Sequence, residues 1–311
     1  MIKLSIIVPF YNVEPFIEEC IRSLYNQDIS WEEYEVICVD DCSPDGSHAI
    51  VEQLQKEYPT LRLICHRENK KLGGARNTGL KVAQGKYIWF VDSDDFIEKN
   101  VLSYLLYVAE HQKLDVLHFD YVNYPFVSAM DRSMPETPVM SGIELLFSPT
   151  FEFDKDLITA WQKIYNRQFL IDNNLFFAEN IMFEDNDFAI AVLAYSQRVK
   201  HINLNAYFYR NNANSITRVK QTVEHINYYL AVVYLLHDLQ VRFVREEKDV
   251  RLINLVINFN RSNIYDILNV YMHANKRDQK EMRKIIKRKV KKTLKSYMPK
   301  LLYYKIILGL F

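Results

Sequence analysis

Glycine is scarce in this chain, with seven residues in 311, and no Gly-x-Gly-x-x-Gly turn follows the first apolar run. A dinucleotide-binding dehydrogenase needs those glycines so that its backbone can approach a pyrophosphate. The segment Pro9-Phe10-Tyr11-Asn12 stands at that place instead. The sequence therefore excludes such a dehydrogenase. It also lacks the Gly-rich, Arg-containing loop expected there of a nucleotidyltransferase.

Cysteine is rare as well. The four cysteines, Cys20, Cys38, Cys42 and Cys65, lie in the first quarter of the chain. Their spacing fits neither a zinc site nor a disulfide framework. We therefore expect reduced thiols that are mostly buried in the core.

Long apolar runs are absent. No uninterrupted run approaches the length of about 20 residues that crosses a bilayer. The run at residues 4–9 is too short for a signal peptide and lacks a cleavage site. The hydrophobic content of 49% and charged content of 25% predict a packed core. We therefore expect a cytoplasmic protein.

The net charge of zero conceals an asymmetry. Residues 276–311 contain thirteen Lys or Arg and two acids, so this segment carries +11 and the rest of the chain carries −11. A basic segment on an acidic body predicts that the segment has its own partner.

The first 120 residues alternate between short apolar runs and segments whose apolar residues have helical spacing. Strands are predicted at residues 4–8, 36–39, 61–65, 87–91 and 116–119, and helices at residues 14–27, 47–58, 75–83 and 101–111. This alternation predicts an α/β fold whose mostly parallel sheet is covered by helices on both faces.

The pattern after residue 120 is weaker. Residues 123–141 predict a long loop or hairpin, residues 184–195 a helix, and residues 199–202 and 206–209 short strands. The pattern is helical from residue 223 onward. We therefore place a domain boundary near Val219, between an α/β domain (residues 1–219) and a helical C-terminal extension (residues 220–311).

Three carboxylates directly follow the predicted strand at residues 87–91. Asp92 and Asp94 are two positions apart, so their side chains point the same way in an extended chain. Paired oxygens of this kind suit a hard divalent cation that also binds phosphate. The alternative is that residues 93–95 cap the next helix.

Polar residues also follow the first three strands, at residues 9–12, 40–47 and 69–79. Because parallel strands end at one edge of the sheet, these residues predict a nucleotide site there. Arg76 is expected near a helix N-terminus, where it can face a phosphate. Any one of these loops alone is also typical of a simple turn or helix cap.

Four segments together resemble the successive motifs of glycosyltransferase family 2. They are Ser5-Ile6-Ile7-Val8-Pro9-Phe10-Tyr11-Asn12, Val39-Asp40-Asp41-Cys42-Ser43, Gly74-Ala75-Arg76-Asn77-Thr78-Gly79 and Val91-Asp92-Ser93-Asp94-Asp95. They occur in the family's order and separations, closely over residues 1–120 and more loosely to Ser215. Cys42 departs from the pattern, because the family usually has Gly there. Since Cys tolerates positive φ poorly, we expect a different turn.

The resemblance implies a GT-A fold that binds a nucleotide sugar, usually uridine-linked, with residues 1–120 as the nucleotide half and residues 121–219 as the acceptor half. It implies that Asp40 and Asp41 hold the base and ribose. It also implies a Mn²⁺ or Mg²⁺ ion at Asp92 and Asp94, with Asp94 as the first choice of direct ligand. The implied nucleotide-binding residues are Pro9, Tyr11, Asp40, Asp41, Arg76, Asp92 and Ser93.

The resemblance further implies Asp185 as the general base for the acceptor, with Glu184 beside it. The alternative is that these acids only complement a helix dipole. It places Trp161 and Lys163 on the acceptor side, where Trp161 stacks on a sugar or is simply a core aromatic. Arg210, with Tyr209 and Ser215, is placed near the phosphates.

The basic C-terminal segment has an apolar stripe at helical spacing, formed by Met282, Ile286, Val290, Leu294 and Tyr297. A basic amphipathic helix predicts peripheral binding to the anionic inner face of the cell membrane. The alternative is that the segment packs on the body of the protein. No nucleic-acid recognition motif accompanies the charge, so a nucleic-acid partner is not expected.

The sequence thus predicts an inverting, metal-dependent glycosyltransferase. Its predicted donor is a UDP-linked sugar, and its acceptor is a saccharide or lipid-linked saccharide in cell-surface polysaccharide synthesis. The alternative is a related nucleotide-sugar-binding or scaffold protein without activity. Loss of an acid at Asp94 or Asp185 would be its sign, and both acids are present.

Overall fold

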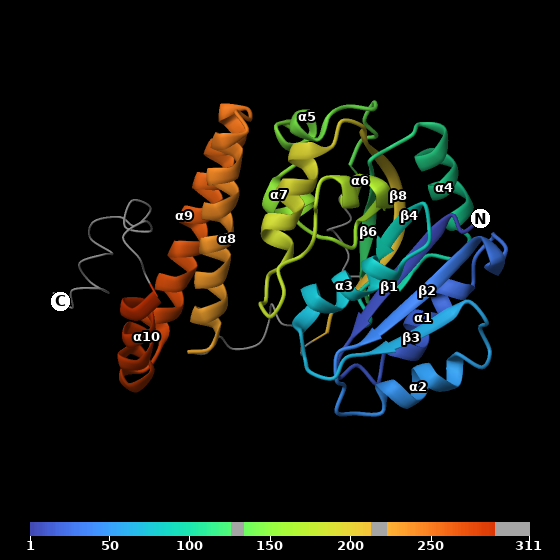
Figure 1. Ribbon diagram of the computed structural model, residues 1–311, viewed down its shortest axis with the longest axis horizontal. Helices are drawn as coiled ribbons and strands as arrows, with labels where there is room; N and C mark the ends of the chain where they lie inside the picture. The colour runs from blue at the N-terminus through green and yellow to red at the C-terminus, as the bar shows by residue number, and fades with distance from the viewer. Residues whose placement is uncertain (126–133, 213–222, 290–311) are drawn as a thin grey trace. The chain divides into compact units, whose positions relative to one another are not determined.

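The computed structural model describes residues 1–125, 134–212 and 223–289 (Figure 1). The chain forms two compact units. The first contains residues 1–180 and 188–213, and the second contains residues 181–187 and 214–311. The boundary expected near residue 219 lies outside the described residues, so it stays a prediction.

The first unit is an α/β structure. Its strands are β1 (Leu4–Phe10), β2 (Tyr34–Asp40), β3 (Leu61–Cys65), β4 (Tyr87–Phe90), β5 (Phe96–Ile97), β6 (Val116–Tyr124), β7 (Lys163–Asn166) and β8 (Val199–Arg210). Its helices are α1 (Ile17–Tyr25), η1 (Trp31–Glu33), α2 (Ser47–Leu54), α3 (Lys71–Val82), α4 (Leu102–His111), α5 (Gly142–Leu146), η2 (Phe153–Leu157), α6 (Arg167–Asp172) and most of α7 (Asp185–Tyr195).

The eight strands form one sheet in the order β3-β2-β1-β4-β7-β6-β8-β5. β1 is parallel to β2 and β4, and β2 is parallel to β3. β7 is antiparallel to β4 and β6. The predicted α/β class with a mostly parallel sheet is therefore confirmed. The two short strands predicted at residues 199–202 and 206–209 form one strand, β8, whose register against β6 shifts on either side of Asp120.

The central strands are buried on both faces, as their continuous apolar runs predict. All seven residues of β1 are buried. Leu4, Ile6 and Val8 pack in a core cluster with residues of α1 and α4. Ile7 faces α3, where a Cβ on Gly79 would lie 2.4 Å from its Cγ2. Gly79 therefore lets α3 approach the sheet closely.

Helix α3 begins at Lys71, four residues before the predicted start. Gly73 and Gly74 are helical and buried, although glycine weakens a helix interior by about 1 kcal/mol. A Cβ on Gly74 would lie 2.4 Å from the Cβ of Lys70, so the close approach of the preceding turn requires glycine there. As a consequence, Arg76 lies in the second turn of α3 and not at its N-terminus.

The second unit contains α8 (His225–Arg245), α9 (Val250–His273) and α10 (Lys276–Lys289). α8 and α9 run side by side as an antiparallel pair, and α10 packs against both (Figure 1). Their apolar faces form one core, to which α10 contributes Met282 and Ile286, each 1% exposed. Among the described residues, no helix has the length and apolar character needed to cross a membrane.

Candidate functional site

Three adjacent strands of the first unit, β2, β1 and β4, end at the same edge of the sheet. The chain leaves β1 toward β2 and β3 on one side, and β4 pairs with β1 on the other side. This reversal of strand order is where open α/β sheets bind ligands. The backbone N–H of Asp41 donates to Phe10 O at 3.0 Å and ties the ends of two strands together.

Asp40 ends β2, Asp41 follows it, and each contacts a histidine. Asp40 Oδ1 accepts from the Ser43 backbone N–H at 2.8 Å, and its Oδ2 lies 2.9 Å from His48 Nδ1. Asp41 Oδ1 lies 2.7 Å from His66 Nδ1 and accepts from the Lys70 backbone N–H at 2.8 Å. Both aspartates are therefore held in fixed orientations at the strand end, as a base- or ribose-binding acid requires.

Asp92 and Arg76 form an ion pair at the end of β4. Arg76 Nη2 donates to Asp92 Oδ1 at 2.7 Å. The guanidinium side chain is 2% exposed and that of Asp92 is 22% exposed. The pair joins the α3 motif to the β4 motif.

Asp95 is buried and bound to the end of β8. Tyr207 donates its hydroxyl to Asp95 Oδ2 at 2.7 Å, and the Arg210 backbone N–H donates to Asp95 Oδ1 at 2.6 Å. The same hydroxyl accepts from the Asp92 backbone N–H at 3.2 Å. Asp95 therefore holds the acidic loop in place.

Arg210 also contacts this loop. Its Nε donates to the Asp94 carbonyl oxygen at 2.9 Å, and its Nη2 donates to Glu19 Oε2 at 2.7 Å. The guanidinium carbon lies 5.2 Å from the ring centroid of Phe96. The structure thus brings Arg210 to the acidic loop, and its role near the phosphates stays a prediction.

The acidic loop is electrostatically unfavourable by itself. Burial raises the pKa of Asp94, and the negative charge of Asp92 raises it further. Burial, followed by the charges of Asp94 and Asp92, raises the pKa of Asp95 well above its usual range. Two half-buried carboxylates that repel one another are a donor set that a hard divalent cation stabilises. Asp92 and Asp94 therefore fit a Mn²⁺ or Mg²⁺ ion.

The remaining residues predicted at the nucleotide differ in exposure. Pro9 is buried within β1, Ser93 is 6% exposed and Tyr11 is 50% exposed. Cys42 has φ 68°, so the turn after β2 keeps the left-handed conformation that glycine usually supplies. The expected change of turn at Cys42 is therefore wrong, and the nearby strand-end contacts hold the backbone in this strained form.

The thiols are less uniformly buried than expected. Cys20 and Cys38 are buried, whereas Cys42 is half-buried and Cys65 is exposed. The last two follow or end strands at the same edge of the sheet as the acids. The expectation of mostly core thiols is therefore correct for only half of them.

The two predicted acceptor-side residues lie inside the first unit. Trp161 is 7% exposed and stacks on Tyr207, with ring centroids 4.5 Å apart. Lys163 is 1% exposed, and its Nζ donates to Leu157 O at 2.7 Å and Thr159 O at 2.5 Å. These contacts favour the core alternative for Trp161, and they make Lys163 part of the scaffold.

Glu184 and Asp185 belong to the second unit. Glu184 is 4% exposed, and Asp185 is the first residue of α7. Phe183 before them has φ 64° and stacks on Tyr229 with ring centroids 5.2 Å apart. The strained backbone at Phe183 marks a fixed turn into α7. Ser215 lies outside the described residues.

Several site residues have no sequence motif that would have found them. His48, His66 and Tyr207 contact the predicted acids from α2, the loop after β3, and β8. They are 8, 25 and 112 positions away from their partners. Only the folded sheet brings them to the strand ends.

The sequence of this chain is similar to those of known proteins. A family model described as Glycosyl transferase family 2 matches residues 5–169. The chain is 38% identical over 225 residues to the uncharacterized glycosyltransferase EpsJ of Bacillus subtilis (strain 168), an alignment that covers 69% of this chain and 63% of that protein. It is 34% identical over 215 residues to the poly(ribitol-phosphate) beta-N-acetylglucosaminyltransferase TarS of Staphylococcus aureus (strain Mu50 / ATCC 700699), covering 67% of this chain and 35% of TarS. The matched region thus spans less than two thirds of either relative.

Solved structures share the fold. S. aureus TarS 1-349 in complex with UDP-GlcNAc matches with a TM-score of 0.75 and 24% identity, over 97% of this chain and 87% of that one. The mannosyltransferase PcManGT from Pyrobaculum calidifontis, in complex with GDP-Man and Mn²⁺, matches with a TM-score of 0.56 and 16% identity, over 99% of this chain and 81% of that one. Because both identities are below 25%, these structural matches show a common GT-A fold alone.

Proposed function

Because the chain belongs to glycosyl transferase family 2, we propose that it is an inverting glycosyltransferase that moves a sugar from a UDP-linked donor to a saccharide or lipid-linked saccharide acceptor. The observation that carries the proposal is the edge of the sheet where Asp40, Asp41 and the Arg76–Asp92 pair meet. The complex of TarS with UDP-GlcNAc supports uridine as the base.

The nucleotide is assigned to the ends of β1, β2 and β4. Asp40 and Asp41 accept hydrogen bonds from the base and ribose, beside Pro9 and Tyr11. Arg76 lies near the diphosphate and holds the Asp92 carboxylate in place. Ser93 lies in the same acidic loop.

The metal is assigned to Asp92 and Asp94. A Mn²⁺ or Mg²⁺ ion held there would neutralise charge on the diphosphate leaving group. The Mn²⁺ in the PcManGT complex supports this assignment. Asp95 is left out of the ligand set because Tyr207 and the backbone of Arg210 already occupy its oxygens.

The chemical step is a single displacement. The acceptor hydroxyl oxygen attacks the anomeric carbon of the donor sugar while the bond from that carbon to the diphosphate oxygen breaks. Asp185 takes the hydroxyl proton, with Glu184 beside it. A carboxylate within hydrogen-bond reach of the acceptor hydroxyl can serve as such a base. One displacement inverts the configuration at the anomeric carbon.

The biological setting follows from the relatives. TarS is named for transfer to poly(ribitol-phosphate), and the relative GgaB of Bacillus subtilis is named a minor teichoic acid biosynthesis protein. We therefore assign the chain to synthesis of a cell-surface polysaccharide. We place it in the cytoplasm at the inner face of the membrane, where lipid-linked acceptors are exposed.

A donor screen tests the proposal. Purified full-length protein is incubated with Mn²⁺ or Mg²⁺ and a panel of UDP- and GDP-sugars, and nucleoside diphosphate release is measured without acceptor. We expect slow release from one UDP-sugar, with UDP-GlcNAc as the first donor to test, and loss of release with a chelator. UDP binding without turnover of any sugar would instead favour the inactive binding protein.

A further inference from the structure

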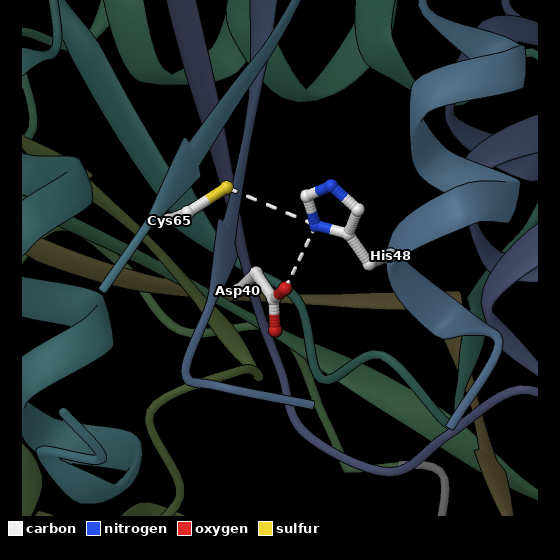
Figure 2. Close-up of side chains that lie close together, drawn as sticks. All are labelled: Asp40, His48 and Cys65. Carbon is white, nitrogen blue, oxygen red and sulfur yellow. Dashed lines mark hydrogen bonds and ion pairs between the residues drawn. The ribbon is translucent and has the colours of Figure 1, made fainter. Parts of the chain in front are cut away.

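Three different metal-binding side chains meet beside the nucleotide edge of the first unit. Asp40 ends β2, Cys65 ends β3, and His48 lies in the first turn of α2. Asp40 and Cys65 are direct partners in the parallel register of β2 and β3. Figure 2 shows their side chains and the His48 ring pointing toward one another.

The distances in this cluster are close to those of a metal site. Asp40 Oδ2 lies 2.9 Å from His48 Nδ1, and Cys65 Sγ lies 3.8 Å from the same nitrogen. The three ligand atoms all lie within 4.8 Å of one another. Tetrahedral zinc has bonds of about 2.0–2.3 Å, which place neighbouring ligand atoms about 3.3–3.6 Å apart. Small side-chain rotations therefore bring all three atoms onto one ion.

The three ligand types favour a transition metal ion of intermediate softness. A carboxylate oxygen, an imidazole nitrogen and a thiolate together suit Zn²⁺, whereas Mg²⁺ and Mn²⁺ prefer oxygen ligands. The Ser43 N–H holds Asp40 Oδ1, which leaves Oδ2 directed at the cluster. Such a fixed outer contact is typical of metal-binding carboxylates.

The cluster is open on one side. The His48 side chain is 42% exposed and Cys65 is exposed, whereas the Asp40 side chain is 7% exposed. An ion therefore has a path from solvent, and water can fill its fourth position. This is the arrangement of three protein ligands and one exchangeable position.

The neighbouring Asp41–His66 pair provides an internal comparison. His66 Nδ1 lies 2.7 Å from Asp41 Oδ1, and His66 Nε2 lies 2.8 Å from Thr78 Oγ1. Both ring nitrogens thus have hydrogen-bond partners, and the side chain is 6% exposed. Among the described residues, the cluster of Asp40, His48 and Cys65 is the one group of three such ligands.

We propose that Asp40, His48 and Cys65 form a Zn²⁺ site, with water as the fourth ligand, and that the bound ion inhibits nucleotide binding. The Cys65 thiol releases its proton to solvent as the sulfur binds the ion. The inhibitory part rests on the proposed function, in which Asp40 accepts from the nucleotide. A carboxylate held by Zn²⁺ is a weaker acceptor, and the ion occupies the edge of the base site.

Cobalt binding tests the site directly. Full-length protein freed of metal by a chelator is titrated with Co²⁺, whose absorption reports thiolate ligation and tetrahedral geometry. We expect a saturable thiolate-to-cobalt band that Zn²⁺ removes. Cys65→Ser and His48→Ala should lose the band, while Cys42→Ser and His66→Ala should keep it. A featureless titration of the wild type, or a band that survives Cys65→Ser, overturns the site.

UDP binding tests the consequence. Calorimetric titration with UDP is carried out at a buffered low concentration of free Zn²⁺ and without Zn²⁺. We expect Zn²⁺ to weaken UDP binding to the wild type by about tenfold or more, which is about 1.4 kcal/mol. Cys65→Ser should be unaffected, which also controls for zinc bound by UDP itself.

The outcomes separate the two proposals. Unchanged UDP affinity in the zinc-loaded wild type overturns inhibition. Failure of UDP to bind even without zinc overturns the proposed function, while the cobalt titration still decides whether the metal site exists.

Discussion

Three neighbouring carboxylates in the acidic loop have different surroundings. Asp95 is 1% exposed and accepts two hydrogen bonds from β8, whereas Asp92 and Asp94 are half-buried. The three acids therefore have different effects on the loop. Asp95 stabilises the loop, and Asp92 and Asp94 create the negative charge that a cation would balance.

Replacing Asp94 should separate activity from stability. We expect Asp94→Ala to abolish sugar transfer, because it removes the first-choice metal ligand. Its melting temperature should equal or exceed that of the wild type, because carboxylate repulsion is relieved. Asp95→Ala is the matched comparison. It should lower the melting temperature, since the buried Tyr207 hydroxyl loses its acceptor at a cost of about 1–3 kcal/mol, and the part-buried Arg210 N–H loses its acceptor too. Near-normal transfer by Asp94→Ala would contradict the metal assignment.

Replacing Asp185 tests the base. We expect Asp185→Asn to leave UDP affinity nearly unchanged and to lower turnover by about 10²-fold or more, because proton removal from the acceptor is lost. Asp187→Asn, two positions further along the same helix turn, serves as the control and should retain turnover. Weakened UDP binding with normal turnover in Asp185→Asn would assign this acid to the donor instead.

A buried polar chain crosses β6 and β8. His118 Nε2 donates to Asp156 O at 2.9 Å, and its Nδ1 lies 2.8 Å from His201 Nδ1. His201 Nε2 lies 3.3 Å from Met134 O and 3.5 Å from Asp120 Oδ1. Burial raises the pKa of Asp120 to about 6.

This pKa predicts a pH dependence of stability. The pKa of Asp120 in the folded protein lies above its ordinary value of 3.8. The contribution of Asp120 to the free energy of unfolding is therefore present at low pH and is lost as the pH rises from about 4 to 6. Asp120→Asn cannot ionise, so it avoids the cost of a buried charge. We therefore expect it to gain stability relative to the wild type over this range, by at most about 3 kcal/mol.

Urea unfolding at pH 4 and pH 7 measures this gain. At each pH, the free energy of unfolding of the wild type is subtracted from that of the variant. This subtraction removes the opposite pH effect of His201, because burial lowers the pKa of His201 to about 4. The exposed Asp172→Asn serves as the control and should show no such trend. Equal stability differences at the two pH values would rule out ionisation of Asp120 as the cause.

At the scale of elements, α10 is part of a core and not a free amphipathic helix. Met282 and Ile286, which belong to the predicted membrane-facing stripe, pack against α8 and α9. Arg283 Nη2 donates to the Tyr271 hydroxyl at 2.7 Å, and the Tyr234 hydroxyl donates to Lys289 O. The packing alternative therefore holds for residues 276–289. Val290, Leu294 and Tyr297 lie outside the described residues.

Two truncations test the packing of α10. A chain ending at Asn275 should lose a melting transition of the helical unit or shift it downward, because two buried side chains worth about 1.5–3 kcal/mol each are removed. A chain ending at Lys289 retains both side chains and should melt near the wild type. Identical melting curves for the two truncations would show that α10 contributes nothing to the core.

At the scale of the whole molecule, the charge asymmetry remains after α10 is packed. Its outward positions include the exposed lysines Lys280, Lys284 and Lys287. Each lysine near an anionic surface contributes about 1 kcal/mol, an attraction that falls off within a Debye length. A basic face on a protein that is otherwise acidic therefore still supports the membrane proposal, through charge more than through the apolar stripe.

Vesicle sedimentation tests this proposal. We expect the full-length protein to sediment with vesicles containing anionic lipid, and to do so less as salt is raised. The triple variant Lys280→Glu, Lys284→Glu and Lys287→Glu should stay in the supernatant. The control variant Lys56→Glu, Lys81→Glu and Lys99→Glu makes the same charge change on exposed residues of the first unit and should sediment. Equal sedimentation of both variants would assign binding to net charge alone.

Much of the fold was predictable from the sequence, as was the edge of the sheet that carries the candidate site. Both depend on local sequence patterns and on one topological rule. Continuous apolar runs predicted β1 to β4, and polar residues directly followed them. In a parallel sheet the carboxyl ends of such strands share an edge, so Asp40, Asp41 and Asp92 were expected together before any contact was known. The family motifs then added roles to these positions.

Tertiary structure decided what depends on contacts between distant positions. The register of β2 and β3 places Cys65 beside Asp40, although the spacing of the cysteines suggested no metal site. Tyr207 reaches Asp95 across 112 positions and so distinguishes a structural acid from its two neighbours. Helices α8 and α9 bury Met282 and Ile286 of α10. The sequence alone does not decide this, because an apolar stripe on a helix is compatible with a membrane surface and with a protein core.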